Sequence, residues 1–339
     1  MSTNPDSGGQ MTPDVAMTLA SITYCADIRG ALKTYLPDWS AVWSPDAAVR
    51  GNYAFIARNE VTGRYAVAIR GSLLNFSWGA FYNWFEQDFN IFEQVDWQYP
   101  VGPQSGQKIS QGSSDGLDDL TELQQTDEAG ATTMLDYLLK YAPGAKQSVA
   151  VVGHSLGGNL ATVFAPWLLY AFRQHSIPPP SLNVYTFAAP PAGNTQFVGA
   201  YDAAFPDSRR YFNTLDIVPM ASVPASIMGM GVLYYPEPQA SEISVTYDGM
   251  TVTLAEAFDA IALLVGASEI ENDNSSYSQT NVEGGSVPLN PDDSYCQTDP
   301  SDPLVVQWFE KAGCEHGHDT YLRLLGAPPV DCEQVPFTP

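Results

Sequence analysis

The sequence predicts an α/β protein with a mostly parallel central sheet flanked by helices. Residues 148–152 form a short, apolar, β-branched run, which is typical of a buried strand. A helical pattern follows over residues 156–172, and a second buried strand is expected at 182–187. This order of strand, helix and strand indicates a parallel sheet covered by helices.

The other expected elements follow from periodicity and turn chemistry. We expect helices over 13–35, 127–141, 254–265 and 319–325, strands over 53–58, 64–70 and 210–213, and a hairpin over 243–254. Three segments lack such patterns: residues 1–11 are expected to be disordered, and 100–118 and 267–303 to be loops, the second a polar insertion. Because no repeat or linker is visible, we expect one domain over residues 1–339.

The chain is strongly acidic. Its 38 acidic and 14 basic residues give a formal net charge of −24, which argues against binding to nucleic acid or to anionic membranes. No apolar stretch reaches the roughly 18 residues that a transmembrane helix needs. The first residues lack a basic start followed by an apolar run, so no signal peptide is visible.

The four cysteines do not form a metal or redox motif. Cys25, Cys296, Cys314 and Cys332 show no C-x-x-C spacing, which argues against a zinc site. Four cysteines allow three full pairings, and free thiols are an equal alternative. The spacing does not choose between them.

A nucleophile is predicted at Ser155. The predicted strand at 148–152 leads into Gly153-His154-Ser155-Leu156-Gly157 and then into a helix, which is the G-x-S-x-G pattern in its strand, turn, helix context. Glycines on both sides leave room for the sharp turn that raises the serine above the sheet. The helix N-terminus directs its free N–H groups at the reacting centre, so the N–H of Leu156 is expected to donate to an oxyanion.

A serine hydroxyl needs a base, and the chain has only four histidines. His154 is expected to point away from Ser155. His175 ends the helix after the serine and would lie about 30 Å from it at 1.5 Å per residue. His316 and His318 remain, and both precede a predicted helix capped by Asp319.

Asp216 is the best candidate for the acid that orients the histidine. It directly follows the predicted strand at 210–213, so it is expected at the catalytic edge of the sheet. An aspartate there would hold the imidazole tautomer and stabilise its positive form. The alternative is an aspartate that caps a turn before Pro219.

Four motifs resemble those of the class 3 lipase family, which includes the filamentous-fungal triacylglycerol lipases. They are IRGS at 69–72, GHSLGGNLA at 153–161, TFAAPPAGN at 186–194 and NTLDIVP at 213–219. The resemblance covers about residues 50–325 and implies the α/β-hydrolase fold. It also implies that Asp216 is the catalytic acid and that Ser72 supplies the second oxyanion donor. The resemblance favours a secreted protein, while the residues themselves leave an intracellular protein as the alternative.

The family resemblance also bears on the choice of histidine. Fungal members place it three residues before an aromatic residue, as His318 precedes Tyr321. Plant and bacterial members often place it five residues before a Tyr-Leu pair, as His316 does. We prefer His316 as the base and keep His318 as the alternative.

Residues 73–92 are very rich in aromatic and aliphatic side chains. In class 3 lipases the segment after R-G-[ST] forms a lid over the site. We therefore expect residues 73–82 to be a lid, and Trp84 and Phe89 to belong to the core. Ordinary core packing of the whole segment is the alternative.

These residues predict a serine carboxylic-ester hydrolase, with a triacylglycerol lipase as the first hypothesis. A phospholipase A1 and a feruloyl-type esterase are alternatives within the enzymes, and a catalytically silent lipid-binding protein is the alternative of another class. The triad mechanism needs no metal or organic cofactor. The expected partner is an ester or lipid at an oil–water interface, and the sequence indicates no protein partner.

Overall fold

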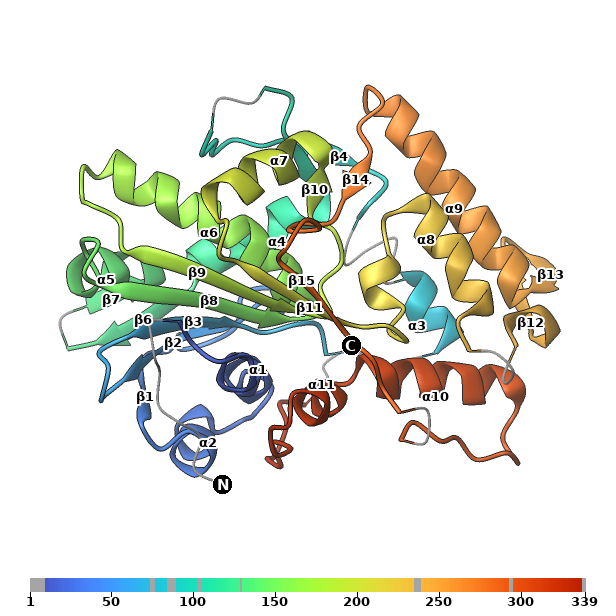
Figure 1. Ribbon diagram of the computed structural model, residues 1–339, viewed down its shortest axis with the longest axis horizontal. Helices are drawn as coiled ribbons and strands as arrows, with labels where there is room; N and C mark the ends of the chain where they lie inside the picture. The colour runs from blue at the N-terminus through green and yellow to red at the C-terminus, as the bar shows by residue number, and fades with distance from the viewer. Residues whose placement is uncertain are drawn as a thin grey trace.

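The computed structural model describes residues 10–73, 77–83, 90–102, 105–128, 130–234, 239–292 and 295–336. Figure 1 shows a central sheet with helices on both faces and a further helical unit beside one end of the sheet. This architecture confirms the predicted fold class.

The central sheet has seven strands in the order β1-β2-β3-β8-β9-β11-β15. The first three strands pair antiparallel, and β3, β8, β9, β11 and β15 run parallel to one another. The bounds are β1 Trp39–Trp43, β2 Ala54–Asn59, β3 Tyr65–Ile69, β8 Ser148–His154, β9 Ser181–Phe187, β11 Arg209–Asn213 and β15 Ser286–Leu289.

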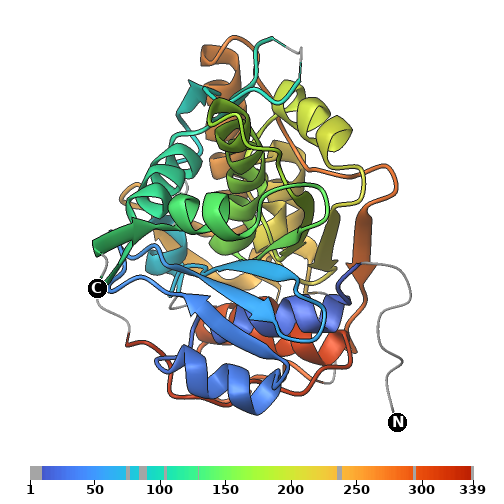
Figure 2. The ribbon, with the colours of Figure 1, turned by 90° about the vertical axis from the view of Figure 1, so that its left-hand side faces the viewer.

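Helices bury both faces of this sheet, which explains the unbroken apolar run of β8. Val149 and Val151 pack into one buried cluster, while Ala150 and Val152 pack into another on the opposite face. One face carries α4 Gln111–Glu122, α5 Met134–Tyr141, α6 Leu156–Gln174 and α7 Thr195–Ala204, and the other carries α1 Pro13–Ile22, α2 Ile28–Tyr35 and α11 His318–Leu324. Figure 2 shows the N-terminal and C-terminal helices, blue and red, together on the second face.

The helical unit beside the sheet has its own buried cluster around Phe258 and Trp308. It contains α3 Trp78–Asn83, α8 Pro224–Gly229, β12 Ser244–Tyr247, β13 Met250–Thr253, α9 Leu254–Glu271 and α10 Leu304–His316. Leu156 packs against this cluster and also against the buried cluster that contains Val149 and Val151 of β8. We propose from this shared packing that the chain forms a single domain.

Short elements complete the described chain. A small four-stranded sheet joins β14 Tyr277–Ser278, β10 Gly193–Asn194, β5 Lys108–Ser110 and β4 Gln94–Asp96, and a hairpin joins β6 Gln124–Asp127 and β7 Gly130–Thr133. Single 3₁₀ turns lie at η2 Val218–Met220, η3 Met230–Val232 and η4 Ala240–Glu242.

Two predicted loops and two predicted helices are wrong. The polar segment 267–303 holds the end of α9, β14 and the edge strand β15. Pro288 is tolerated in β15 because, among the described strands, only β11 pairs with it. The Gly- and Ser-rich segment 100–118 contains β5 and most of α4, whose Leu117 and Leu120 are buried. The helix expected over 13–35 is two helices, and β7 precedes the helix expected from 127.

The turn between β8 and α6 depends on glycines at close backbone contacts. Ser155 has a φ of +59° and a ψ of −130°, a backbone conformation that residues other than glycine rarely adopt. A Cβ on Gly153 would lie 2.0 Å from the carbonyl oxygen of Gly157. A Cβ on Gly157 would lie 2.3 Å from the carbonyl oxygen of Ile69 in β3. These glycines let the turn pack against the neighbouring strand.

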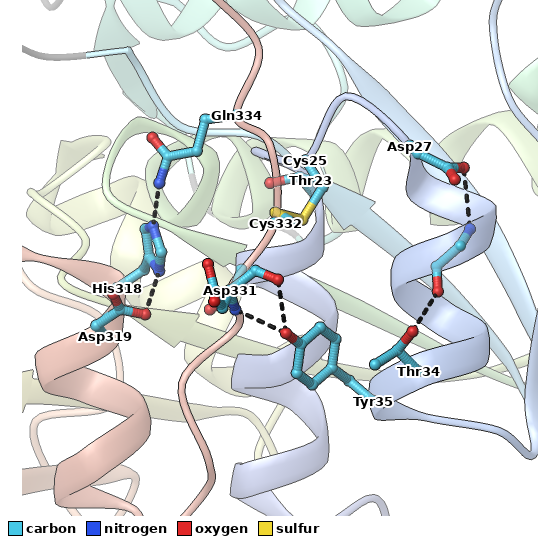
Figure 3. The surroundings of a disulfide bond; sticks show 12 residues. Thr23, Cys25, Asp27, Thr34, Tyr35, His318, Asp319, Asp331, Cys332 and Gln334 are labelled. Carbon is cyan, nitrogen blue, oxygen red and sulfur yellow. Dashed lines mark hydrogen bonds and ion pairs between the residues drawn. A yellow bond between two sulfur atoms is a disulfide. The ribbon is translucent and has the colours of Figure 1, made fainter.

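All four cysteines form disulfide bonds. Cys25, just after α1, pairs with Cys332 near the C-terminal end, and Cys296 pairs with Cys314 in α10. Figure 3 shows the first bond between the N-terminal helices and the C-terminal segment. The sequence left this pairing open because it depends on which distant segments meet.

We expect the Cys25–Cys332 bond to stabilise the fold more than the second bond. The bonds join residues 307 and 18 positions apart, and chain entropy makes the longer closure worth roughly 2.5 kcal/mol more. Denaturant unfolding of the double variants Cys25→Ser/Cys332→Ser and Cys296→Ser/Cys314→Ser measures the difference. Equal losses, or a larger loss for the second pair, would contradict this account.

Gly157→Ala should destabilise the protein by roughly 3 kcal/mol, because the new methyl group would press on backbone atoms that cannot move alone. Gly266→Ala is the matched control, since its Cβ would meet only Pro224 Cγ at 3.9 Å in the interior of α9. That change should raise the free energy of unfolding by about 0.5–1 kcal/mol. Urea unfolding of both variants tests the contrast, and a tolerated Gly157→Ala would show that the turn has more room.

Candidate active site

The side chains of Ser155, His316 and Asp216 form one continuous hydrogen-bonded chain. Ser155 stands between β8 and α6, Asp216 follows β11, and His316 is the last residue of α10. His316 Nδ1 lies 2.9 Å from Asp216 Oδ2, and His316 Nε2 lies 2.8 Å from Ser155 Oγ. Because a carboxylate only accepts, the imidazole hydrogen sits on Nδ1 and leaves Nε2 to accept the serine proton. All three residues are at most 3% exposed.

Asp216 is held by two further donors. Its Oδ1 accepts from the backbone N–H of Val218 at 2.9 Å, and its Oδ2 accepts from the Tyr321 hydroxyl at 2.8 Å. That hydroxyl in turn accepts from the backbone N–H of Asn213 at 2.8 Å. These bonds fix both carboxylate oxygens and so fix the direction in which the imidazole points.

The end of β11 is also tied to the end of α10. Asn213 Nδ2 donates to the carbonyl oxygen of Glu315 at 2.9 Å and to Glu315 Oε2 at 2.8 Å. Both residues are buried, and Glu315 directly precedes His316. The asparagine of the NTLDIVP motif therefore fixes the backbone next to the histidine.

The structure separates the other histidine candidates from Ser155. His318 begins α11, and its ring stacks on that of Tyr24 at a centroid distance of 5.2 Å. Its hydrogen bond lowers the pKa of the neighbouring Asp319 carboxyl. His175 is exposed at the far end of α6, as expected.

His154 points away from the nucleophile, as expected, but it does contact the site. Its Nε2 lies 2.8 Å from the carbonyl oxygen of His316, and its Nδ1 lies 3.1 Å from the Tyr24 hydroxyl. Burial, together with the charges of His316 and His318, places the pKa of His154 well below its usual value. His154 is therefore neutral at neutral pH.

The loop after β3 brings Ser72 next to the nucleophile. A Cβ on Gly71 would lie 2.5 Å from the carbonyl oxygen of His154 and 3.0 Å from Ser155 Cβ, so this loop touches the turn. The Ser72 hydroxyl is buried and has no hydrogen-bond partner among the described residues. Leu156 is the first residue of α6, where backbone N–H groups have no partner within the helix. Donors from two elements thus flank Ser155.

Two clefts adjoin the site and share Ser72, Leu73 and Val335. The smaller cleft has a volume of about 290 Å³ and is lined by His316, His318 and Tyr24 among others. The larger cleft, about 590 Å³, extends along Leu156 toward polar side chains of α4. The larger cleft therefore offers space beside Leu156, and the smaller one offers space beside His316.

Part of the aromatic segment lies outside the described residues. This applies to Trp84 and Phe89, for which core positions are predicted, and to residues 74–76 of the expected lid. Trp78 is described: its indole N–H donates to the carbonyl oxygen of Thr246 at 2.9 Å, and its ring lies 6.3 Å from that of Phe309. The start of α3 thus packs against β12 and α10 within the helical unit beside the sheet.

Sequence reasoning missed Tyr24 and used Tyr321 only to mark a spacing. Tyr24 meets His154 across 130 residues, and no motif around it signals that contact. Tyr321 meets Asp216 across 105 residues. Only the position of Tyr321 five residues after His316 carried a signal, and that signal came from the family resemblance.

The described residues contain no group of three or more His, Cys, Asp or Glu side chains arranged to hold a metal ion. They also contain no helix that combines the length and apolar character needed to cross a membrane.

Comparison with known structures supports the same fold. The crystal structure of M37 lipase superposes with a TM-score of 0.67 at 23% identity, over 93% of this chain and 92% of that one. The triacylglyceride lipase of Rhizomucor miehei aligns over 61% of this chain and 71% of its own, with a TM-score of 0.44 and 25% identity. The M37 likeness confirms the α/β-hydrolase fold.

Sequence comparison points to one family. The family described as Lipase (class 3) matches residues 66–225, a range that holds Ser72, Ser155 and Asp216 but ends before His316. Lipase ZK262.3 of Caenorhabditis elegans is 42% identical over 72 residues, which are 21% of this chain and only 19% of that protein. Together with the order of the four motifs, this match makes the chain similar to the class 3 lipase family over residues 66–225.

Proposed function

We propose that this protein is a carboxylic-ester hydrolase, specifically a triacylglycerol lipase, that acts through Ser155, His316 and Asp216. The observation that carries the proposal is the unbroken chain of hydrogen bonds from Ser155 Oγ through the imidazole to the carboxylate. Similarity to the class 3 lipase family over residues 66–225 supports an ester as the substrate.

The proposed reaction has two steps, formation of an acyl-enzyme and its hydrolysis, and both use the same three side chains. His316 Nε2 takes the Ser155 proton while Oγ attacks the ester carbonyl, and Asp216 stabilises the resulting imidazolium. The imidazolium then gives the proton to the leaving alcohol. In the second step, His316 activates water, which attacks the acyl-enzyme and releases the acid.

The negative charge of each tetrahedral intermediate needs donors that are already in place. The N–H groups of Leu156 and Ser72 and the Ser72 hydroxyl fill this role in the proposal. The hydroxyl is well suited because it is buried without a partner among the described residues, so no existing bond must break.

We further propose that residues 73–82 act as a lid over the acyl site. The described part supports this, because Trp78 packs against β12 and α10 and Leu73 lines both clefts. Such an apolar cover favours ester presented at an oil–water interface. Equal rates on dissolved and emulsified triacylglycerol would contradict the lid.

His316→Ala and Ser155→Ala should each remove nearly all ester cleavage, while His318→Ala should keep most of it. Removing a triad member lowers kcat by roughly four orders of magnitude or more. The assay is p-nitrophenyl ester cleavage followed by hydrolysis of emulsified triacylglycerol. An active His316→Ala variant would reject this base, and a wild type inactive on every ester would favour a silent lipid-binding protein.

Ser72→Ala should lower kcat roughly a hundredfold with little change in KM. The substitution removes the hydroxyl, whose hydrogen bond to the oxyanion stabilises the transition state and not the bound substrate. Ser148→Ala is the matched control. Ser148 begins β8 at the opposite end from Ser155, and its hydroxyl is also buried without a partner among the described residues. If both variants kept wild-type kcat, the Ser72 hydroxyl would have no part in stabilising the oxyanion.

A further inference from the structure

A second set of hydrogen bonds holds the backbone of His316, and the proposed mechanism does not use it. It consists of the Tyr24 hydroxyl, the His154 imidazole and the His316 carbonyl, joined by contacts of 3.1 Å and 2.8 Å. All three residues are at most 6% exposed. None of these contacts touches the Ser155 hydroxyl, so they need a separate explanation.

The protons in this chain can be assigned from chemistry alone. A carbonyl oxygen only accepts, so His154 Nε2 must carry the hydrogen that it donates to His316. The neutral imidazole then has an acceptor at Nδ1, and the Tyr24 hydroxyl must donate to it. Burial keeps both groups in these forms, since it lowers the pKa of His154 and raises that of Tyr24.

The His316 carbonyl is a group that needs such a partner. His316 is the last residue of α10, where carbonyl groups have no donor within the helix, and Gly317 separates it from α11. His154 supplies the donor from the residue next to Ser155. One side chain therefore links the backbone of the proposed base to the backbone of the nucleophile.

The disulfide bond next to Tyr24 ties the residue that follows this tyrosine to the C-terminal segment. Cys25 is bonded to Cys332, and the C-terminal segment pairs with the same stretch of backbone. The N–H of Val335 donates to the carbonyl oxygen of Tyr24 at 2.9 Å, and the N–H of Ala26 donates to that of Glu333 at 2.8 Å. Figure 3 shows this C-terminal segment running beside Cys25.

We propose that Tyr24 and His154 are positioning residues for His316, and that the Cys25–Cys332 bond supports catalysis by holding Tyr24. The proposal rests on the proposed function, because it assumes that His316 is the base. It predicts that loss of the Cys25–Cys332 bond lowers kcat because the Tyr24 hydroxyl is then no longer held against His154.

The first test is Tyr24→Phe, which removes only the hydroxyl and leaves a buried imidazole acceptor without its donor. We expect kcat to fall roughly tenfold with KM almost unchanged, because the base is misplaced while the clefts remain. Tyr35→Phe is the matched control. Tyr35 also bonds to the C-terminal segment, through Asp331 at 2.7 Å and 2.8 Å (Figure 3). Among the described residues, the hydrogen bonds of the His154 ring go to Tyr24 and His316 and not to Tyr35.

Substitutions of His154 provide a rescue test. Glutamine places an amide N–H near the position of Nε2 and should keep much of kcat, whereas His154→Leu has no donor and should lose at least tenfold more. Circular dichroism and thermal unfolding confirm that each variant is folded. Equal kcat values for folded His154→Gln and His154→Leu would overturn the positioning role.

A double-mutant cycle tests the disulfide. Cys25→Ser/Cys332→Ser should lower kcat several-fold in the wild-type background, measured well below its unfolding temperature, and should add little to Tyr24→Phe. Additive effects, or an unchanged kcat in folded Tyr24→Phe, would overturn the inference. If His316→Ala remained active, the proposed function itself would fail, so the two failures are distinguishable.

Discussion

The left-handed backbone at Ser155 is the constraint on which the rest of the structure depends. A φ of +59° in a serine costs roughly 1–3 kcal/mol, so the surroundings must impose it. Strand β8 ends at the preceding residue, His154, and pairs along its length with β9, while α6 starts at the following residue, Leu156. The sheet fixes the position of the turn, and the glycines at 153 and 157 allow the strand and the helix to approach closely.

Every other group of the site is placed relative to that turn. The loop after β3 touches it through Gly71, β11 carries Asp216 to the same edge, and the side chain of His154 reaches from it to the end of α10. The histidine is the only member of the proposed triad that comes from outside the central sheet and its crossover. This explains why several independent bonds hold it: one from His154, and others at Glu315 and Asp216.

Much of this arrangement could be predicted from the sequence because it is encoded locally. The apolar run of β8 and the glycines around Ser155 lie within ten residues of one another. Asp216 lies three residues after the end of β11. Family resemblance added the spacing from His316 to Tyr321. The structure then distinguishes the two histidines, because α10 ends at His316 and α11 begins at His318, so that only the first faces Asp216.

The features that sequence reasoning missed depend on distant partners. Strand β15 is short and contains Pro288, and it becomes a strand only because β11 offers its free edge. Helix α4 is rich in Gly, Ser and Asp, and its helical state comes from burial of one face rather than from propensity. The disulfide pairing and the contact of Tyr24 with His154 likewise require segments from opposite ends of the chain to meet.

The Cys25–Cys332 bond also has a consequence for biosynthesis. At about 5–20 residues per second, a ribosome needs roughly 15–60 s to make the 307-residue interval between the two cysteines. Cys25 must stay reduced or be re-paired during that time, while Cys296 and Cys314 emerge as competing partners before Cys332 does. The bond beside Tyr24 can therefore form only after Cys332 has been translated, 307 residues after Cys25, and its formation is an oxidation.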